Sequence, residues 1–208
     1  MNYSKLGKST DYVWSNDPKR LGITLSRYKF VSKMVSKSDC LLEVGCGDSF
    51  QNRIVKQSCK SLTAIDMQKN LILEAKINKS KIFPVTHIHH NILSGPVSKT
   101  KNLYDGVFSL DVLEHIDKKN EKKFIKNSIF NLKKNSYLLV GMPSIESQKY
   151  ASYKTKKSHI NCKSGDELKK TFQSFFHNVI LFSMNDEVIH TGFSKMAHYL
   201  IVLCTTKK

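Results

Sequence analysis

The run Leu41-Leu-Glu-Val-Gly-Cys-Gly-Asp-Ser49 constrains the fold more than any other part of the chain. A short apolar stretch carries Glu43 near its end and then breaks at Gly45 and Gly47. Closely spaced glycines after a strand let the backbone turn sharply and approach a bound ligand where a Cβ would clash. We therefore expect a central strand that leads into a ligand-binding turn, with Glu43 pointing into the same crevice.

Strand-like and helix-like stretches alternate along the rest of the chain. The predicted strands are Cys40–Val44, Leu62–Ile65, Val85–Ile88, Tyr104–Leu110, Tyr137–Met142, Val179–Met184 and Ala197–Cys204. The predicted helices are Leu21–Val35, Gln51–Gln57, Leu71–Ile77, Glu121–Leu132 and Asp166–Phe176, the last with Ser164 as its N-cap. This alternation indicates an α/β fold with a parallel sheet covered on both faces. The connection between the last two strands is too short for a crossover helix, so these strands should pair antiparallel.

Length and composition limit the class of protein. A chain of 208 residues suits one domain with at most a small appendage. No apolar run reaches eighteen residues, and the N-terminus lacks the apolar region of a signal peptide, so we expect neither a membrane span nor export. The five cysteines are odd in number, scattered and without a CxxC pair, which predicts reduced thiols in a cytoplasmic protein.

The net charge of +17 leaves three interpretations open. It could reflect a lysine-rich solvated surface, an anionic small substrate, or RNA. Only Arg20, Arg27 and Arg53 are arginines among the 34 basic residues, whereas nucleic-acid surfaces favour arginine. We therefore expect a small-molecule substrate, preferably an anionic one. Nucleic acid is a weaker alternative that stays open, and the oligomeric state is not assigned.

The motif at 43–49 resembles the acidic-x-Gly-x-Gly-x-Gly signature of class I S-adenosylmethionine-dependent methyltransferases, with Ser49 in place of the third glycine. Asp66 ends the second predicted strand, where such proteins carry a carboxylate for the ribose. The run Asp111-Val-Leu-Glu-His115 is similar to the form found in the small-molecule branch of the family. The resemblance covers about residues 20–204. It implies a Rossmann-like three-layer sandwich with a seven-stranded, mostly parallel sheet, one antiparallel strand and the order 3-2-1-4-5-7-6.

The resemblance also implies S-adenosyl-L-methionine as cofactor and S-adenosyl-L-homocysteine as product. Asp66 would accept from the ribose hydroxyls, Asn91 from the adenine amino group, and the backbone near Leu110 and Asp111 would receive the methionyl amine. Arg27 would clamp the methionyl carboxylate. The full set of expected cofactor-binding residues is Arg27, Glu43, Gly45, Cys46, Gly47, Asp66, Met67, Asn91, Ile92, Leu110 and Asp111.

The acceptor is expected to be a hydroxyl on a small, anionic or sugar-like metabolite. The chain lacks the Asn/Asp-Pro-Pro-Tyr/Phe motif of base-amino methyltransferases and the Pro-Cys nucleophile of cytosine-C5 methyltransferases. Its segments 141–148, 158–162, 185–193 and 196–199 resemble bacterial methyltransferases that we associate with polysaccharide biosynthesis. Two alternatives remain: an RNA or protein methyltransferase, and a non-catalytic subunit that keeps the cofactor.

Histidines are the candidate catalytic groups, because an alcohol needs a base to remove its proton and histidine titrates near neutral pH. The candidates are His115, His159 and His190. We expect no metal site. His87, His89 and His90 look like a cluster, but a strand would place His90 on the opposite face from the other two, and no acidic residue flanks them.

The expected domain organisation is an N-terminal arm and lid helix over residues 1–36 and a methyltransferase domain over residues 37–208. Residues 1–18 are polar and turn-rich. The aromatic residues Tyr12, Trp14 and Tyr28 either form a lid over the site or pack into the core.

Overall fold

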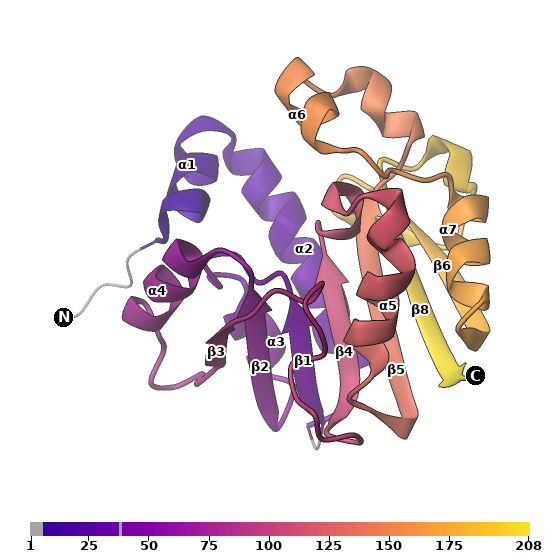
Figure 1. Cartoon of the computed structure of the whole chain (residues 1–208). Helices are drawn as coiled ribbons and strands as arrows, with labels where there is room; N and C mark the ends of the chain where they lie inside the picture. The colour runs from indigo at the N-terminus through magenta and orange to yellow at the C-terminus, as the bar shows by residue number, and fades with distance from the viewer. Residues whose placement is uncertain (1–5, 38) are drawn as a thin grey trace.

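A single eight-stranded sheet organises the part of the chain that the computed structural model describes, residues 6–37 and 39–208 (Figure 1). Its strands are β1 (Cys40–Val44), β2 (Ser61–Asp66), β3 (Thr86–His89), β4 (Tyr104–Leu110), β5 (Leu132–Pro143), β6 (Phe176–Asn185), β7 (Val188–His190) and β8 (Tyr199–Lys207). The α-helices are α1 (Lys8–Asn16), α2 (Pro18–Met34), α3 (Asn52–Lys56), α4 (Lys69–Ile77), α5 (Glu121–Ile129), α6 (Tyr153–Ser158) and α7 (Gly165–Gln173). Short 3-10 helices are η1 (Leu113–His115), η2 (Lys118–Asn120), η3 (Glu146–Tyr150) and η4 (Ser194–Met196).

The strand order β3-β2-β1-β4-β5-β8-β6-β7 confirms the predicted topology and adds one strand. Strands β1 to β5 pair in parallel, and β8 runs antiparallel to both β5 and β6. The expected number of seven strands was one too few, because β7 forms a short hairpin with β6. The turn of this hairpin places Asp186 at a φ of 50°, a left-handed conformation that aspartate tolerates better than most residues. A strand of three residues is too short for hydrophobic alternation to reveal.

Helices cover both faces of the sheet. On one face α5 and α7 bury Phe124, Ile125 and Phe172 against the strands. On the other face α2 and α3 contribute Val31 and Val55 to a second apolar cluster. Figure 1 shows α5 and α7 in front of the sheet and α2 and α3 behind it. The result is the predicted three-layer α/β sandwich, with its core on either side of the central strands.

The boundary between α5 and β5 differs from the prediction. The helix was expected to continue to Leu132, but it ends at Ile129, and Leu132 opens β5 opposite Tyr104. Leu132 is 1% exposed, so its apolar character serves the sheet rather than the helix. Periodicity cannot assign an apolar residue at such a junction. The predicted N-cap of α7 is confirmed, since Ser164 and Glu167 form a reciprocal capping box.

Two segments cover the carboxyl edge of the parallel strands, α1 from the N-terminal side and η3 with α6 from the segment after β5 (Figure 1). The sequence suggested turns for residues 1–18, but residues 8–16 form α1; residues 1–5 of that arm lie outside the described part. Tyr12 and Trp14 are 68% and 56% exposed, so neither packs into the core. Tyr28 is buried.

All five cysteines are free thiols. None of the helices formed by residues 6–37 and 39–208 has both the length and the apolar character needed to cross a bilayer.

Candidate active site

The glycine turn after β1 is built by close backbone packing. Gly45 and Gly47 have φ values of +86° and +56°, which side chains rarely tolerate. The N–H groups of Gly45 and Cys46 both donate to the Ile65 carbonyl at 2.8 and 3.0 Å, which ties the turn to the end of β2. A Cβ on Gly45 would collide with the Val112 side chain, whereas a Cβ on Gly47 would enter open space. The turn therefore needs glycine at the first position for packing and leaves room for a ligand at the second.

Ser49 replaces the third glycine at a cost in backbone strain. It adopts a φ of 62°, the conformation that a glycine would hold easily. Its hydroxyl lies 2.7 Å from His87 Nε2, and this hydrogen bond holds the turn against β3. His89 and His90 contact two other groups, the carbonyls of Met67 and Gly95. The three histidines therefore take separate structural partners.

The Glu43 side chain does not line the cleft but lies beneath its wall. Its side chain is fully buried, and its Oε1 accepts a hydrogen bond of 2.7 Å from the Tyr28 hydroxyl. Burial raises the pKa of Glu43 from its ordinary value of 4.5 to about 8, although the Tyr28 hydroxyl opposes this shift. Tyr28 itself lines the cleft, so Glu43 supports the cleft wall from beneath.

Asp66 closes the same turn from the end of β2. Its carboxylate accepts hydrogen bonds from the backbone N–H of Gly47 at 2.9 Å and of Gln68 at 2.8 Å. The side chain thereby links the glycine turn to the loop before α4. It also lines the cleft, where its remaining lone pairs can accept from ligand hydroxyl groups.

A cleft of about 540 Å³ opens where β1, β2, β3 and β4 end, at the point where the strand order reverses between β1 and β4. This is the position at which open α/β sheets bind ligands. Nine of the eleven predicted cofactor residues line it, together with His115: Gly45, Cys46, Gly47, Asp66, Met67, Asn91, Ile92, Leu110 and Asp111. The other two, Arg27 and Glu43, do not. The prediction missed Asp48 and Gln51, which line the cleft from the turn into α3.

A second cavity, of about 350 Å³, adjoins the cleft under α1, α2 and α6. The two share several residues, among them Asp111 and His115. Polar side chains dominate its lining, including Ser147, Gln148 and Thr155. Arg20, Arg27, Glu114 and His159 also line it. The connected pair of cavities can hold two ligands in contact with each other.

Arg27 and Asp111 meet between the two cavities. Arg27 Nη1 lies 2.9 and 2.7 Å from the two carboxylate oxygens of Asp111, and its guanidinium stacks 3.6 Å from the centre of the Tyr199 ring. Burial opposes the charge of Arg27, but the Asp111 carboxylate raises the pKa of Arg27 above its ordinary value. Asp111 adopts a φ of 57°, a strained conformation of the kind that gathers at functional sites. Arg27 thus forms an ion pair with Asp111 and lines the second cavity rather than the cleft.

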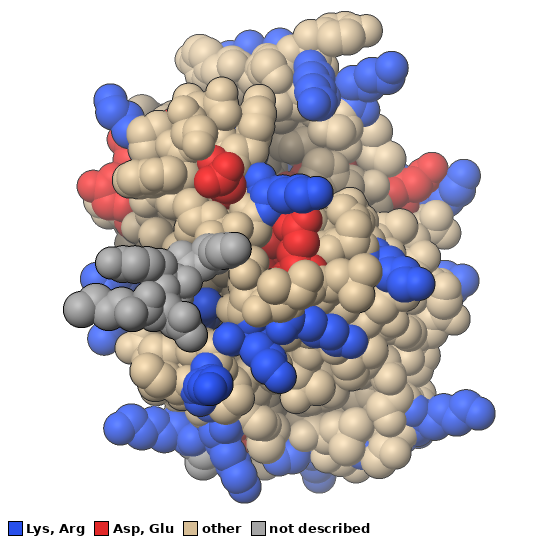
Figure 2. Space-filling view, turned by 90° about the vertical axis from the view of Figure 1, so that its left-hand side faces the viewer, with Lys and Arg blue, Asp and Glu red and all other residues tan. Residues whose placement is uncertain are grey.

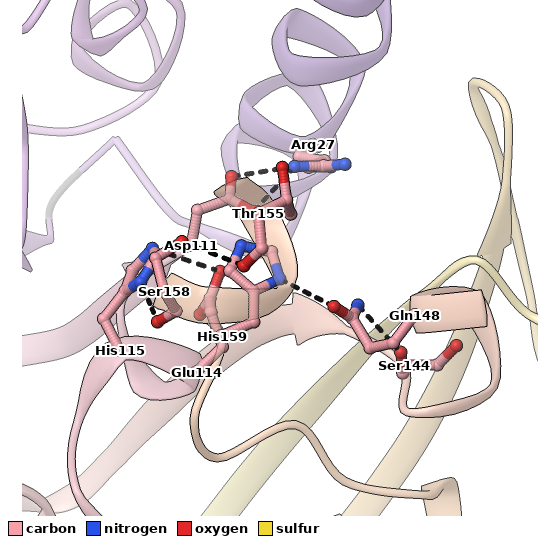
Figure 3. Close-up of polar contacts among 9 residues, drawn as sticks. All are labelled: Arg27, Asp111, Glu114, His115, Ser144, Gln148, Thr155, Ser158 and His159. Atoms are coloured by element: carbon pink, nitrogen blue, oxygen red, sulfur yellow. Dashed lines mark hydrogen bonds and ion pairs between the residues drawn. The ribbon is translucent and has the colours of Figure 1, made fainter. Parts of the chain in front are cut away.

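Glu114, His115 and His159 converge at the floor of the second cavity (Figure 3). His115 Nε2 lies 4.0 Å from Glu114 Oε1, and the two imidazole rings are 5.0 Å apart at an angle of 73°. Glu114 is 1% exposed, and burial together with the nearby Asp111 raises its pKa well above the ordinary range. Burial and the adjacent His115 lower the pKa of His159. The fold therefore brings together two of the three predicted catalytic histidines.

The third, His190, lies elsewhere. It belongs to β7, where its ring contacts Asn185 Oδ1 at 3.1 Å and accepts from the Gly192 N–H at 2.9 Å. It lines neither the cleft nor the second cavity. Glu114 and Gln148 were not predicted as site residues, although both stand in the family-like segments of the sequence, at 111–115 and 141–148.

Comparison with known proteins agrees with this site. A family model for the methyltransferase domain matches residues 42–140. A search of curated proteins gave no significant match to the chain.

Solved structures of methyltransferases share the fold. A SAM-dependent methyltransferase from Thermotoga maritima is 13% identical, with a TM-score of 0.68 over 95% of this chain and 100% of that one. The N-methyltransferase NodS from Bradyrhizobium japonicum, solved with S-adenosyl-L-homocysteine, is 17% identical, with a TM-score of 0.64 over 96% and 97%. The plantazolicin methyltransferase BpumL, also solved with S-adenosyl-L-homocysteine, is 13% identical, with a TM-score of 0.68 over 96% and 90%.

The residues around the cleft fit the cofactor of this family. Bare backbone at Gly47 leaves space for the ligand, and Asp66 offers a buried carboxylate beside it. The family match over residues 42–140, which spans the glycine turn and β4, assigns a methyltransferase domain to this part of the chain, and the cleft fits S-adenosylmethionine as its cofactor.

Proposed function

We propose that this enzyme methylates a hydroxyl group of a small, anionic or sugar-like metabolite. The observation that carries the proposal is the polar cavity of about 350 Å³ that joins the cleft at Asp111 and His115. Its volume suits a ligand of small-molecule size. S-adenosylmethionine supplies a methyl group on a positively charged sulfur. The walls shared by the cavity and the cleft hold the acceptor next to that group, and such positioning is a large part of methyl-transfer catalysis.

The lining of the cavity supports an oxygen-rich acceptor. Ser147, Gln148 and Thr155 offer hydroxyl and amide groups of the kind that hydrogen-bond sugar hydroxyls. Arg27 is neutralised by Asp111, but Arg20 forms no ion pair within residues 6–37 and 39–208. Its guanidinium is free to bind a phosphate or carboxylate on the acceptor.

The two histidines at the junction support a hydroxyl as the methylated group. An alcohol becomes a useful nucleophile only as its proton leaves, so the site must favour that loss. His115 lines both cavities, and His159 lines the second beside it. NodS is an N-methyltransferase, so methylation on nitrogen is the alternative that the experiment below distinguishes from methylation on oxygen.

For the cofactor, we propose that Asp66 accepts from the ribose hydroxyls, Asn91 from the adenine, and that Leu110 and Asp111 flank the methionyl group. Their positions around one cleft support this arrangement. Arg27 would act through Asp111, by fixing its carboxylate, rather than by clamping the cofactor directly. The free thiols support a reducing, cytoplasmic setting, and the resemblance of segments 141–148 and 158–162 supports a polysaccharide pathway.

The surface charge favours a small acceptor over a polyanion. On the face shown in Figure 2, basic side chains occur from top to bottom, and acidic side chains lie among them in the upper half. On that face the positive charge is therefore spread out rather than confined to one stripe. A protein that binds RNA is expected to concentrate such charge along the path of the backbone.

The test is a partition experiment. The purified enzyme is incubated with methyl-labelled S-adenosylmethionine and, separately, with the metabolite, RNA and protein fractions of its host. We expect label in the metabolite fraction, carried by an oxygen. The Arg20→Gln variant should raise the KM for this acceptor about ten-fold or more, with an unchanged Kd for the cofactor. Label in RNA or protein, or on nitrogen, would overturn the proposal. Absence of label in every fraction, with cofactor still bound, would favour a non-catalytic subunit.

A further inference from the structure

We propose that Glu114, His115 and His159 form a binding site for one divalent transition-metal ion. One potential ligand atom from each residue lies within 4.8 Å of the others, and these three form the single such group among residues 6–37 and 39–208. Two ligands of one ion can be separated by up to about 4.2 Å when each contact is about 2.1 Å. The 4.0 Å between His115 Nε2 and Glu114 Oε1 already fits this limit. Ligand atoms as far apart as 4.8 Å need only a small inward rotation of their side chains to bind the same ion.

Both imidazole rings are held in the state that a metal requires. His115 Nδ1 donates to the Ser158 carbonyl at 2.9 Å, so its Nε2 carries the lone pair (Figure 3). His159 Nδ1 lies 3.1 Å from Gln148 Oε1. The Gln148 amide nitrogen donates to Ser144 and Ser147, which orients its oxygen as the acceptor for His159. Metal-binding histidines characteristically donate their second N–H in this way, because the bond fixes the ring and raises its basicity.

Glu114 supplies an independent reason for a cation. Its side chain is 1% exposed, and its buried Oε2 has no hydrogen-bond partner in the described part of the chain. A buried carboxylate oxygen that lacks a partner is costly, and a bound cation offsets that cost. The Arg27 guanidinium, whose charge also acts on Glu114, pairs directly with Asp111. A metal ion would displace the proton that burial favours on Glu114 and would give its Oε2 a partner.

The backbone fixes the three ligands relative to each other. Glu114 and His115 lie on η1, directly after β4, whereas His159 caps the end of α6. The Asn161 N–H donates to the Glu114 carbonyl at 3.0 Å and joins the two segments. Two segments remote in sequence therefore meet on a defined framework, as a pre-formed site requires.

The donor set selects the type of metal. Two imidazoles and one carboxylate suit Mn²⁺, Fe²⁺, Co²⁺ or Zn²⁺, whereas Mg²⁺ and Ca²⁺ prefer oxygen donors alone. Three protein ligands leave positions open toward the second cavity, which all three residues line. A ligand oxygen in that cavity can complete the coordination.

This part of the inference rests on the proposed function. The cation would bind the acceptor hydroxyl and lower its pKa, so that its proton passes to solvent water. The oxygen lone pair then forms the new C–O bond, and the S–CH3 electron pair remains on sulfur as S-adenosylhomocysteine leaves. His115 and His159 would then act as metal ligands rather than as bases.

Metal binding can be measured without an acceptor. Chelator-treated enzyme is titrated with Mn²⁺, Co²⁺ and Zn²⁺, and free metal is followed by spin resonance for Mn²⁺ or by a competing chromogenic chelator for the others. We expect one ion per chain for at least one metal. The Glu114→Gln, His115→Ala and His159→Ala variants should each weaken its binding at least ten-fold. The His177→Ala variant removes an exposed histidine on β6 and should bind as the wild type does.

Each variant is also titrated with S-adenosylhomocysteine to show that the fold survives. If no metal binds at about millimolar concentration, which corresponds to a binding free energy of only about −4 kcal/mol, the site does not exist. Binding that survives in the three ligand variants would equally overturn the proposal.

A more specific variant pair tests the support of His159. Gln148→Leu removes the acceptor for the His159 Nδ1–H and should weaken metal binding by about 10- to 100-fold. Gln148→Glu keeps an acceptor at that place and should retain the affinity. Equal affinities for these two variants would contradict the proposed geometry.

The catalytic role has its own readout. Once the partition experiment has identified the acceptor, methyl transfer to it is measured with and without a chelator. Transfer should stop in the presence of the chelator and return when the metal that binds is added. Transfer that persists in metal-free enzyme would refute the role in catalysis. If no acceptor becomes labelled while the metal titration succeeds, the proposed function fails and the metal site stands.

Discussion

At the scale of single residues, the site depends on buried acidic side chains and on one residue with a strained backbone. Glu43 is fully buried beneath the glycine turn, Asp111 adopts a left-handed φ, and the buried Glu114 Oε2 has no partner in the described residues. The sequence predicted Glu43 and Asp111 from a family motif. The expectation that Glu43 points into the crevice was wrong, because its side chain points to Tyr28 and does not line the cleft. The side-chain directions depend on partners remote in the chain: Tyr28 for Glu43, and Arg27 for Asp111.

The raised pKa of Glu43 predicts how stability depends on pH. Folded Glu43 has a pKa of about 8 against an ordinary value of 4.5, so the folded state holds a proton that the unfolded state has lost between these values. The contribution of Glu43 to stability is therefore complete below about pH 4.5 and disappears as pH rises toward 8, by up to about 1.4 kcal/mol per pH unit.

In the Glu43→Gln variant this dependence should vanish, because the amide cannot ionise and can still accept from Tyr28. Urea unfolding at several pH values across that interval measures the effect as a difference between the variant and the wild type. Parallel pH profiles for the two proteins would show that Glu43 does not carry the buried proton.

Gly45 and Gly22 form a pair with opposite expected effects. Alanine at position 45 would hold a φ of +86° and drive its Cβ into Val112, so Gly45→Ala should lower the free energy of unfolding by about 2–4 kcal/mol. Alanine at position 22, inside α2, would meet no atom within 4 Å. Gly22→Ala should raise the free energy of unfolding by about 0.5–1 kcal/mol. Denaturant titration measures both, and a change of the same sign at the two positions would contradict the packing described for the turn.

At the scale of elements, the strands were predicted better than the segments that cover the carboxyl edge. Both Cys40–Val44 and Tyr104–Leu110 match the observed β1 and β4 at each end. Their apolar side chains are buried on both faces, which leaves a clear signal in the sequence. By contrast, α1 and α6 are short and polar, so their helical form depends on tertiary contacts that a local pattern does not contain.

One such contact ties α1 to the glycine turn. The Asp48 carboxylate accepts from the backbone N–H and the hydroxyl of Thr10, both at 2.8 Å. Because Asp48 and Thr10 are both buried, these bonds should hold α1 over the two cavities. The Asp48→Ala variant should therefore increase amide hydrogen exchange in residues 8–16 about ten-fold or more, since each lost hydrogen bond to a charged group is worth about 1.5–3 kcal/mol.

The exposed ion pair between Lys8 and Glu74 provides the control. It spans 4.0 Å, and the Lys8 side chain is 91% exposed. Lys8→Ala should leave the exchange of α1 nearly unchanged, because exposed pairs contribute little. Unaltered exchange in Asp48→Ala as well would mean that α1 is held by other contacts.

At the scale of the whole molecule, the fold and the cofactor cleft follow from local sequence signals, and the acceptor side does not. Nine predicted cofactor residues meet at one cleft because they lie at or just after the ends of parallel strands, and all such strand ends share one edge. The second cavity is assembled from α1, α2, η1 and the segment after β5. No periodicity in the sequence relates His159 to Glu114. The sequence therefore suggested His159 only as a catalytic base, whereas the structure places it in a cluster with Glu114 and His115.

The central claim is that this cleft binds the cofactor through Asp66, and its most direct test is a calorimetric titration with S-adenosylhomocysteine. We expect one molecule bound per chain by the wild type. The Asp66→Asn variant should bind at least ten-fold more weakly, because it loses a charged acceptor for the ribose hydroxyls. The Asp186→Asn variant, in the β6–β7 turn, should bind normally. Undiminished affinity in Asp66→Asn, or no binding by the wild type, would contradict the assignment of this cleft and of Asp66 to the cofactor.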